Sequence, residues 1–483
     1  MKTVLFLDRA PLTIFYAKMT PYMEGVKCIH VAYSQKDVEI LAEYNIKPDY
    51  VYSDLFRHQY DTLSYDESEL ARIDEDIIKN TNGRFNLNGA VQSDRGFSIL
   101  TYDETLRSAV AHYKVWETIY NEQHVDLVLH EPCSLFFNFI GCVLCKRQGG
   151  AFTYQIASTS DKYEYSYLNA VNDDFSYPEI VDNYNKFISN PSLIDRERCD
   201  VFLKKFRENQ KAFLGGLLNR KVSAYKLLKE AAKNAFVRHT YKKKYNRIYD
   251  NINYWLLQNN RPWMKFKNLM GYKWNNIKFE TEIPKGEKYF FFPFHLEPEA
   301  AVLYLGDGIY KNQVKLIENI AASLPAGYYL YVKDHPHEFA YREPIDYKRL
   351  MAVPNIRLIN QWMSSKAIMK DAQGVITING TAGFEAVLQN KQVYCFGHNM
   401  YSFLPRVNYI KNIRDLRDII LDNIEKQYED DVELRAFVMA YLESSHPGYT
   451  DCYSGGVFID GFDYEGNARN IAADMIRFVN RYV

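Results

Sequence analysis

Short apolar segments alternate with amphipathic ones along the first part of this chain, and this alternation constrains the fold more than any other feature. The strand-like segments are residues 3–8, 27–33, 125–130 and 151–156. Helical apolar spacing is found at 104–123 and 134–148. Strands that alternate with helices favour βαβ units and a parallel sheet.

A second alternating series begins near residue 288. Its strand-like segments are 289–294, 328–333, 355–359, 374–378 and 392–396. Its helix-like segments are 311–323, 364–371 and 381–389. We therefore predict an α/β chain with two Rossmann-like, doubly wound domains that face each other across a cleft. In such sheets, ligands bind at the carboxyl ends of the strands.

A basic aromatic segment separates the two series. Residues 220–278 hold 15 Lys or Arg against two acidic residues, in a chain of net charge −1. Trp and Tyr among basic groups suit an anionic membrane surface. A solvated helical insertion or a single-stranded nucleic-acid site would have a similar composition. The predicted domains are 1–165, a basic helical insertion or connector at 166–284, 285–445, and a tail at 446–483 whose helix packs back on the first domain.

Composition excludes several classes of protein. No apolar run approaches the roughly 20 residues that cross a bilayer. Seven sparse cysteines argue against a disulfide scaffold and fit a reducing cytoplasm. Cys142 and Cys145 have no second pair, so we interpret them as core residues rather than zinc ligands. The only Asp-x-Asp, at 74–76, lies in a charged helix-like stretch, and we predict no metal site and no cofactor.

Polar residues follow the strand at 328–333. Lys333 and His335 leave one strand end, where both could reach a phosphate oxygen, and Pro336 fixes the chain after them. His337 completes the turn. This set of residues is unusual for a plain polar turn and predicts phosphate binding.

A Gly-x-x-Gly turn follows the strand at 374–378. Its glycines would let a ligand approach the backbone, and the first free N–H groups of the following helix favour an anion. Thr381 could cap the helix or donate to phosphate, and Glu385 could accept from ribose hydroxyls. The predicted nucleotide-binding residues here are Asn379, Gly380, Thr381, Gly383 and Glu385.

Other strand ends supply candidate acid–base groups. His295 follows the strand at 289–294 and could bind phosphate or exchange a proton, with Glu297 at the same edge. In the first series, Glu131 follows the strand at 125–130 and is a candidate base for an acceptor hydroxyl. Asp8 and Arg9 end the first strand in the same way, as candidate acceptor-side residues.

Three blocks of sequence together resemble bacterial capsule polysaccharide biosynthesis proteins, including the Kdo-transferring enzymes of capsule assembly. They are FPFHLEPEA at 292–300, VKDHPHE at 332–338 and TINGTAGFEAVLQNKQVYCFG at 377–397. The resemblance implies a GT-B glycosyltransferase whose C-terminal domain binds the nucleotide donor. It also implies that His335 with Pro336, and Ser364 with Ser365, contact the donor phosphate.

The function implied is transfer of a sugar from a nucleotide-activated donor, with CMP-Kdo or a similar donor favoured. The acceptor would be a growing surface polysaccharide or its lipid-linked form, reached from the inner face of the bacterial plasma membrane. Three alternatives remain open: a CDP-polyol phosphotransferase, a nucleotide-sugar epimerase and a non-catalytic glycan-binding assembly factor. The nucleotide sugar is a substrate, and no nucleic-acid partner is expected.

Overall fold

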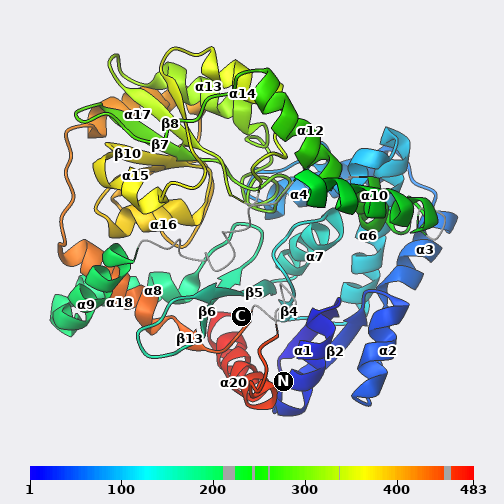
Figure 1. Ribbon diagram of the computed structural model, residues 1–483. Helices are drawn as coiled ribbons and strands as arrows, with labels where there is room; N and C mark the ends of the chain where they lie inside the picture. The colour runs from blue at the N-terminus through cyan, green and yellow to red at the C-terminus, as the bar shows by residue number, and fades with distance from the viewer. Residues whose placement is uncertain (210–223, 242–244, 259–260, 337, 451–457) are drawn as a thin grey trace. The chain divides into compact units, whose positions relative to one another are not determined.

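A computed structural model of the chain describes residues 1–209, 224–241, 245–258, 261–336, 338–450 and 458–483. His337 and residues 220–223, 242–244 and 259–260 of the basic segment therefore lie outside the described residues. The chain forms two compact units (Figure 1). Unit 1 comprises residues 1–189, 247–251 and 438–483, and unit 2 comprises 190–246 and 252–437.

Unit 1 is built on a seven-stranded sheet in the order β13-β6-β5-β4-β1-β2-β3. Its strands are β1 (Thr3–Asp8), β2 (Lys27–Ala32), β3 (Tyr50–Val51), β4 (Leu127–Leu129), β5 (Ala151–Ser158), β6 (Ser166–Val171) and β13 (His446–Pro447). β1 to β5 are parallel, while β6 pairs antiparallel with both β5 and β13. The parallel part is a Rossmann half with strand order 3-2-1-4-5.

The helices of unit 1 connect and cover these strands. They are α1 (Leu12–Met19), α2 (Gln35–Glu43), α3 (Tyr52–Thr62), α4 (Glu67–Asn80), α5 (Leu87–Gln92), α6 (Tyr102–Glu122), α7 (Phe136–Arg147), α8 (Pro178–Ser189) and α20 (Tyr464–Tyr482). Thr101 begins α6 with a capping box, in which its side chain accepts from Glu104 N–H and the Glu104 carboxylate accepts from Thr101 N–H.

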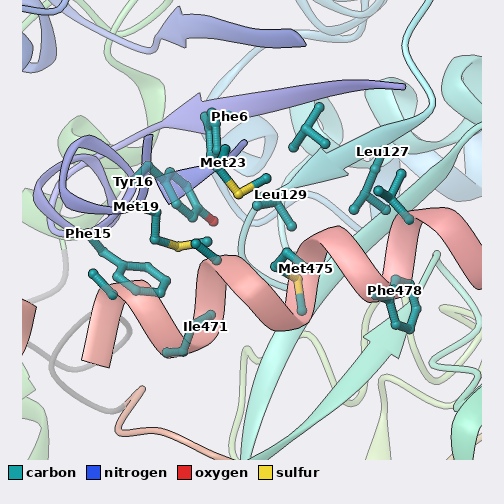
Figure 2. Packing of buried hydrophobic residues seen from close by; sticks show 14 of the residues in the cluster. Phe6, Phe15, Tyr16, Met19, Met23, Leu127, Leu129, Ile471, Met475 and Phe478 are labelled. Carbon is teal, nitrogen blue, oxygen red and sulfur yellow. The ribbon is translucent and has the colours of Figure 1, made fainter. Parts of the chain in front are cut away.

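The last helix, α20, completes the core of unit 1. Ile471, Met475 and Phe478 recur along one face of α20 and are buried against β1, β4 and α1, as Figure 2 shows. Each such side chain contributes about 1.5–3 kcal/mol relative to an exposed one. The same helix places Asp474 in the core, where its carboxylate accepts from Tyr167 Oη at 2.8 Å. The end of the chain is therefore an integral part of the first unit.

Unit 2 contains a fully parallel sheet in the order β12-β11-β10-β7-β8-β9. The strands are β7 (Tyr289–Pro293), β8 (Tyr329–Lys333), β9 (Ile356–Ile359), β10 (Gly374–Thr377), β11 (Gln392–Cys395) and β12 (Val407–Tyr409). In chain order this is the 3-2-1-4-5-6 arrangement of a complete Rossmann sheet. The central strands β7, β8, β10 and β11 are buried on both faces, which explains their largely apolar sequences.

Helices lie on both sides of this sheet (Figure 1). They are α13 (Gln313–Ser323), α14 (Pro344–Met351), α15 (Ser365–Asp371), α16 (Thr381–Leu388) and α17 (Leu416–Asn423). The pair α15 and α16 packs together, as does the pair α13 and α14. The predicted α/β class with two Rossmann-like halves is confirmed, and the cleft between them stays a prediction.

The remaining helices are α9 (Arg196–Glu208), α10 (Ala224–Tyr241), α11 (Asn251–Gln258), α12 (Arg261–Trp274) and α18 (Val432–Glu443). They show that the predicted connector at 166–284 is divided between the units. Residues 166–189 belong to unit 1, because β6 pairs with β5 and α8 packs on β6. Most of the rest belongs to unit 2, where α12 packs on α14. Unit 1 also includes residues 438–445, which the sequence predicts to be part of the domain at 285–445.

Candidate nucleotide site at the carboxyl edge of the second sheet

The candidate site lies where the strand order of unit 2 reverses. β7 pairs with β8 on one side and with β10 on the other, so the connections from β7 and β10 leave the sheet in opposite directions. This switch point is where doubly wound sheets open a crevice for a ligand. His295 follows β7, Lys333 ends β8, and Asn379 and Gly380 follow β10. The tertiary structure thus brings the three predicted motifs to one edge.

His295 crosses the switch point. Its Nε2 accepts from Asn379 N–H at 3.4 Å and lies 3.3 Å from Thr377 Oγ1. A Cβ on Gly380 would lie 2.9 Å from the same nitrogen, so the absence of a side chain there lets the imidazole approach. Burial lowers the pKa of His295 to about 4, and the nearby charge of His335 acts in the same direction. His295 is therefore neutral at pH 7, which suits it to accept a hydrogen bond and to position the β10–α16 turn.

Lys333 is the buried cation of the site. Its Nζ donates to Ser365 Oγ at 2.8 Å, which joins the end of β8 to the first turn of α15. Burial lowers the pKa of Lys333 to about 8, although the charges of Glu385 and Asp334 oppose this. A desolvated cation that donates to a neutral hydroxyl attracts an anion, because the low-dielectric surroundings screen its charge weakly.

Two helices begin at this edge of the sheet, α15 beside Lys333 and α16 after the turn that follows β10. Ser364 caps α15, its Oγ accepting from Ala367 N–H at 3.4 Å, so this hydroxyl serves its own helix. α16 begins after Gly380, which has no side chain to cap the helix. Gly383 N–H donates to the Gly380 carbonyl at 3.0 Å, so Thr381 and Ala382 are the residues whose N–H groups could reach an anion, at the end of α16 where the helix dipole favours one. Thr381 lies half-buried at the first position of that helix.

The second glycine of the Gly-x-x-Gly turn has a packing role. A Cβ on Gly383 would lie 2.3 Å from Tyr401 Oη and 2.4 Å from Cζ of the same ring. The Tyr401 hydroxyl donates to the Gly380 carbonyl at 2.7 Å and so holds the start of α16. The sequence predicted that both glycines make room for a ligand, whereas the structure shows that Gly383 makes room for Tyr401.

A polar network that the sequence did not predict supports the β7 and β8 turns. The Gln313 amide accepts from His295 N–H at 2.8 Å and donates to the His295 carbonyl at 3.1 Å. Arg342 lies over the Phe294 ring, 3.7 Å from its centroid, and donates to Glu297 at 2.9 Å. Glu297 is thus engaged in an ion pair that positions the turn. No sequence signal marks Gln313 or Arg342, because their partners come from other elements.

Asp334 and His335 form the turn after β8. The Asp334 carboxylate accepts from His335 N–H at 2.8 Å and from the hydroxyl of Tyr347. His335 is half-buried and Asp334 is buried, so the imidazole is the accessible member of the pair. The buried carboxylate thereby fixes the backbone from which His335 extends.

The corresponding edge of unit 1 holds the acceptor-side candidates. Arg9 after β1 forms an ion pair with Glu131 after β4, and this pair spans the switch point of the first sheet. Asp8 is buried and accepts from His30 Nδ1 at 2.9 Å, and burial raises the pKa of Asp8 to about 6. Asp8 therefore has a structural partner within the core, while Glu131 remains partly exposed.

The residues weighed as metal ligands have other partners. Asp76 on α4 accepts from Tyr113 Oη at 2.6 Å and from Arg147 at 2.7 Å, so the carboxylate is part of an ion-pair network rather than a fully solvated face. Cys142 and Cys145 are buried in α7, as predicted for core residues. Over the described ranges, no group of three or more His, Cys, Asp or Glu could hold a metal ion. In the same ranges, no helix is long and apolar enough to cross a membrane.

Comparison with solved structures finds low similarity. UDP-GlcNAc 2-epimerase from Methanocaldococcus jannaschii aligns at 11% identity over 92% of this chain and 98% of its own, with a TM-score of 0.25. KpsC of Thermosulfurimonas dismutans, a beta Kdo 2,7 transferase, aligns at 11% identity over 75% and 89%, with a TM-score of 0.30. At these TM-scores, the alignments establish neither an activity nor a ligand for this chain. Comparison with curated protein sequences finds no match.

The comparison with protein families gives a definite result. Residues 197–405 match the family model described as capsule polysaccharide biosynthesis protein. This range contains β7 to β11 and the whole candidate site of unit 2. The resemblance predicted from the three motifs is confirmed: residues 197–405 of this chain resemble the capsule polysaccharide biosynthesis protein family.

Proposed function

We propose that this protein is a glycosyltransferase that moves a sugar from a nucleotide-activated donor to a growing capsule polysaccharide or its lipid-linked acceptor. The observation that carries the proposal is the site at the β7–β10 switch point, where buried Lys333 and the N-terminus of α16, which has no side-chain cap, share one edge of the sheet. Such a site is electropositive without being strongly solvated, as a nucleotide phosphate requires.

The chemistry follows from the bond that breaks. When the sugar–phosphate bond cleaves, the sugar carbon transfers to an acceptor oxygen and the bonding electrons stay on the leaving phosphate. Lys333, His335 and the N–H groups of Thr381 and Ala382 would stabilise that negative charge. These groups could do so without a metal ion, and we propose a metal-independent reaction. Ser365 would keep the Lys333 ammonium oriented.

The acceptor hydroxyl must lose a proton as the new bond forms. Glu131 is the proposed base, because it is a partly exposed carboxylate at the switch point of the first sheet. Its partner Arg9 would hold the carboxylate in a fixed orientation. We infer a cytoplasmic enzyme acting at the inner face of the plasma membrane, since a lipid-linked acceptor would be presented there.

The donor is proposed to be CMP-Kdo or a similar CMP-activated sugar, on the strength of the resemblance in residues 292–397. A thermal-shift screen with CMP, CDP, UDP and GDP tests this choice. We expect CMP to give the largest shift, because a ligand at 100 times its dissociation constant stabilises the folded state by about 2.7 kcal/mol. A selective response to UDP or GDP would contradict the CMP donor. No response to any nucleotide, with or without a glycan acceptor, would contradict nucleotide-dependent transfer.

Nucleotide affinity should fall as the pH rises through about 8. Lys333 has a lowered pKa of about 8 in the free protein, so below that pH it carries the charge that attracts phosphate. Above it, the free protein must take up a proton before binding, and affinity drops by up to about tenfold per pH unit. Calorimetric titration of CMP between pH 6.5 and 9.5 measures this. In Lys333→Met the decline should disappear, and an unchanged decline would exclude Lys333 as its origin.

A further inference from the structure

Helices α10 and α12 each present a line of exposed aromatic and lysine side chains with the same spacing. Positions i, i+4 and i+11 lie on one face of a helix. The residues at these positions are Tyr225, Lys229 and Phe236 on α10, and Trp263, Lys267 and Trp274 on α12. We call these two lines the aromatic–lysine stripes.

The opposite face of each helix packs on the protein. Leu227 and Ala231 are buried on α10. On α12, the Asn268 amide donates to the Ala340 carbonyl at 3.1 Å, and the Tyr272 hydroxyl donates to the Arg342 carbonyl. Because these contacts fix the orientation of α12, its stripe is directed away from the core that the helix covers.

The stripes expose more aromatic surface than a solvated helix requires. Trp274 is 92% exposed, Tyr225 77% and Phe236 74%. Large apolar side chains grouped on an otherwise polar surface mark an interaction site. A solvated helical insertion would bury these rings or separate them with paired charges, and neither is observed along the two lines.

The charges accompanying the rings are almost entirely positive. α12 contains four Lys or Arg and no acidic residue, while α10 contains four and one acid, Glu230. Among the described residues, neither Lys229 nor Lys267 forms an ion pair with an acidic group. Each stripe therefore offers an unneutralised ammonium between two aromatic rings.

We propose that the aromatic–lysine stripes bind the surface of a bilayer that contains anionic lipids, with α10 and α12 lying in the plane of the interface. Tyr and Trp rings sit at headgroup level, and lysine stems cover apolar surface while their ammonium groups reach lipid phosphates. Charge complementarity favours this partner over a neutral surface. The contact needs no nucleotide and is independent of the proposed sugar transfer.

Vesicle co-sedimentation of the full chain tests the proposal. Vesicles of phosphatidylcholine with about 30% phosphatidylglycerol should bind the protein at least tenfold more tightly than phosphatidylcholine alone. High salt should reduce this binding, because the Debye length falls to about 3 Å at 1 M. Equal binding to both vesicles, or no binding to either, would overturn the proposal.

Two variants assign the binding to the stripes. Lys229→Glu with Lys267→Glu should weaken binding to anionic vesicles at least tenfold. Trp263→Ala with Trp274→Ala should also weaken this binding at least tenfold, and the loss should persist when variant and native chain are compared at high salt. The matched control is Lys36→Glu with Lys47→Glu, which reverses two exposed lysines of unit 1 and should bind as the native chain does. Stripe variants that bind vesicles normally would refute the assignment.

Two further measurements distinguish membrane binding from a folding defect and from nucleic-acid binding. Circular dichroism melting should show each stripe variant folded, since its substituted side chains are exposed, and CMP should still produce the native thermal shift.

If single-stranded DNA binds more tightly than anionic vesicles and the stripe variants lose only the binding to DNA, the stripes bind nucleic acid and the membrane proposal is wrong. If the protein binds anionic vesicles as expected but no nucleotide shifts its melting temperature, the proposed transferase function is contradicted and the membrane site is retained.

Discussion

Replacing Lys333 with methionine, or His335 with alanine, is expected to abolish donor turnover while the protein stays folded. Lys333 is the buried cation beside Ser365, and its loss removes the charge proposed to stabilise the leaving phosphate. Removing one group of this kind lowers turnover by about 100-fold or more. Methionine has a similar length and avoids the desolvation cost of a buried ammonium, so the fold should tolerate it. Release of the nucleotide from the sugar donor measures the effect.

A lysine elsewhere in the same unit provides the control. Burial also lowers the pKa of the Lys391 ammonium. Lys391 follows the C-terminus of α16, however, whereas Gly380 precedes its N-terminus. Lys391→Met should therefore retain turnover. If Lys333→Met or His335→Ala keeps near-native turnover, or if Lys391→Met loses it equally, the phosphate site has been assigned to the wrong residues.

Gly383→Ala is expected to destabilise unit 2 and to weaken nucleotide binding together. The added methyl group would overlap the Tyr401 hydroxyl and ring, and Tyr401 is fully buried, so its ring has no free space to enter. Overpacking of this kind costs about 1–3 kcal/mol. The displaced ring also releases the Gly380 carbonyl, so the first turn of α16 would lose its alignment. Urea unfolding and CMP titration measure the two effects.

A double-mutant cycle identifies the cause. Tyr401→Ala alone should cost about 3–5 kcal/mol through the cavity it leaves. In Gly383→Ala with Tyr401→Ala, the steric overlap is gone, so the pair should be less destabilised than the sum of the single changes. Tyr401→Phe keeps the ring and removes only the hydrogen bond to Gly380, at about 1 kcal/mol. Strictly additive free energies in the cycle would show that the two side chains do not compete for space.

The regular elements of both sheets follow from local sequence patterns. The strand predicted at 3–8 is β1, and the helix predicted at 381–389 is α16 to within one residue. Strands buried on both faces must be apolar throughout, so their sequences identify them. β6 was missed because Ser166 and Asn169 interrupt its apolar pattern. These polar groups find partners only in the folded sheet: Asn169 Nδ2 donates to Asp474 of α20 at 3.2 Å, and Ser166 Oγ donates to the Ser158 carbonyl of β5 at 3.1 Å.

The candidate site was predicted in part. Lys333, His335 and Gly380 were identified because polar residues at strand ends stand out against apolar strands. Two other predicted residues have different roles, because each contacts a residue from another element. Gly383 accommodates Tyr401 and Glu297 pairs with Arg342, and neither partner is near in the sequence.

The sequence by itself determined the two α/β series, the strand ends that carry polar residues, and the basic aromatic composition of residues 220–278. These are local properties, since each depends on residues that are close together in the sequence. Only the tertiary structure decided that β7 lies between β8 and β10, that Lys333 contacts Ser365, and that α20 completes unit 1. The physical reason is that packing between distant segments selects the strand neighbours and the buried polar partners. The periodicity within one segment does not predict which other segments it will contact.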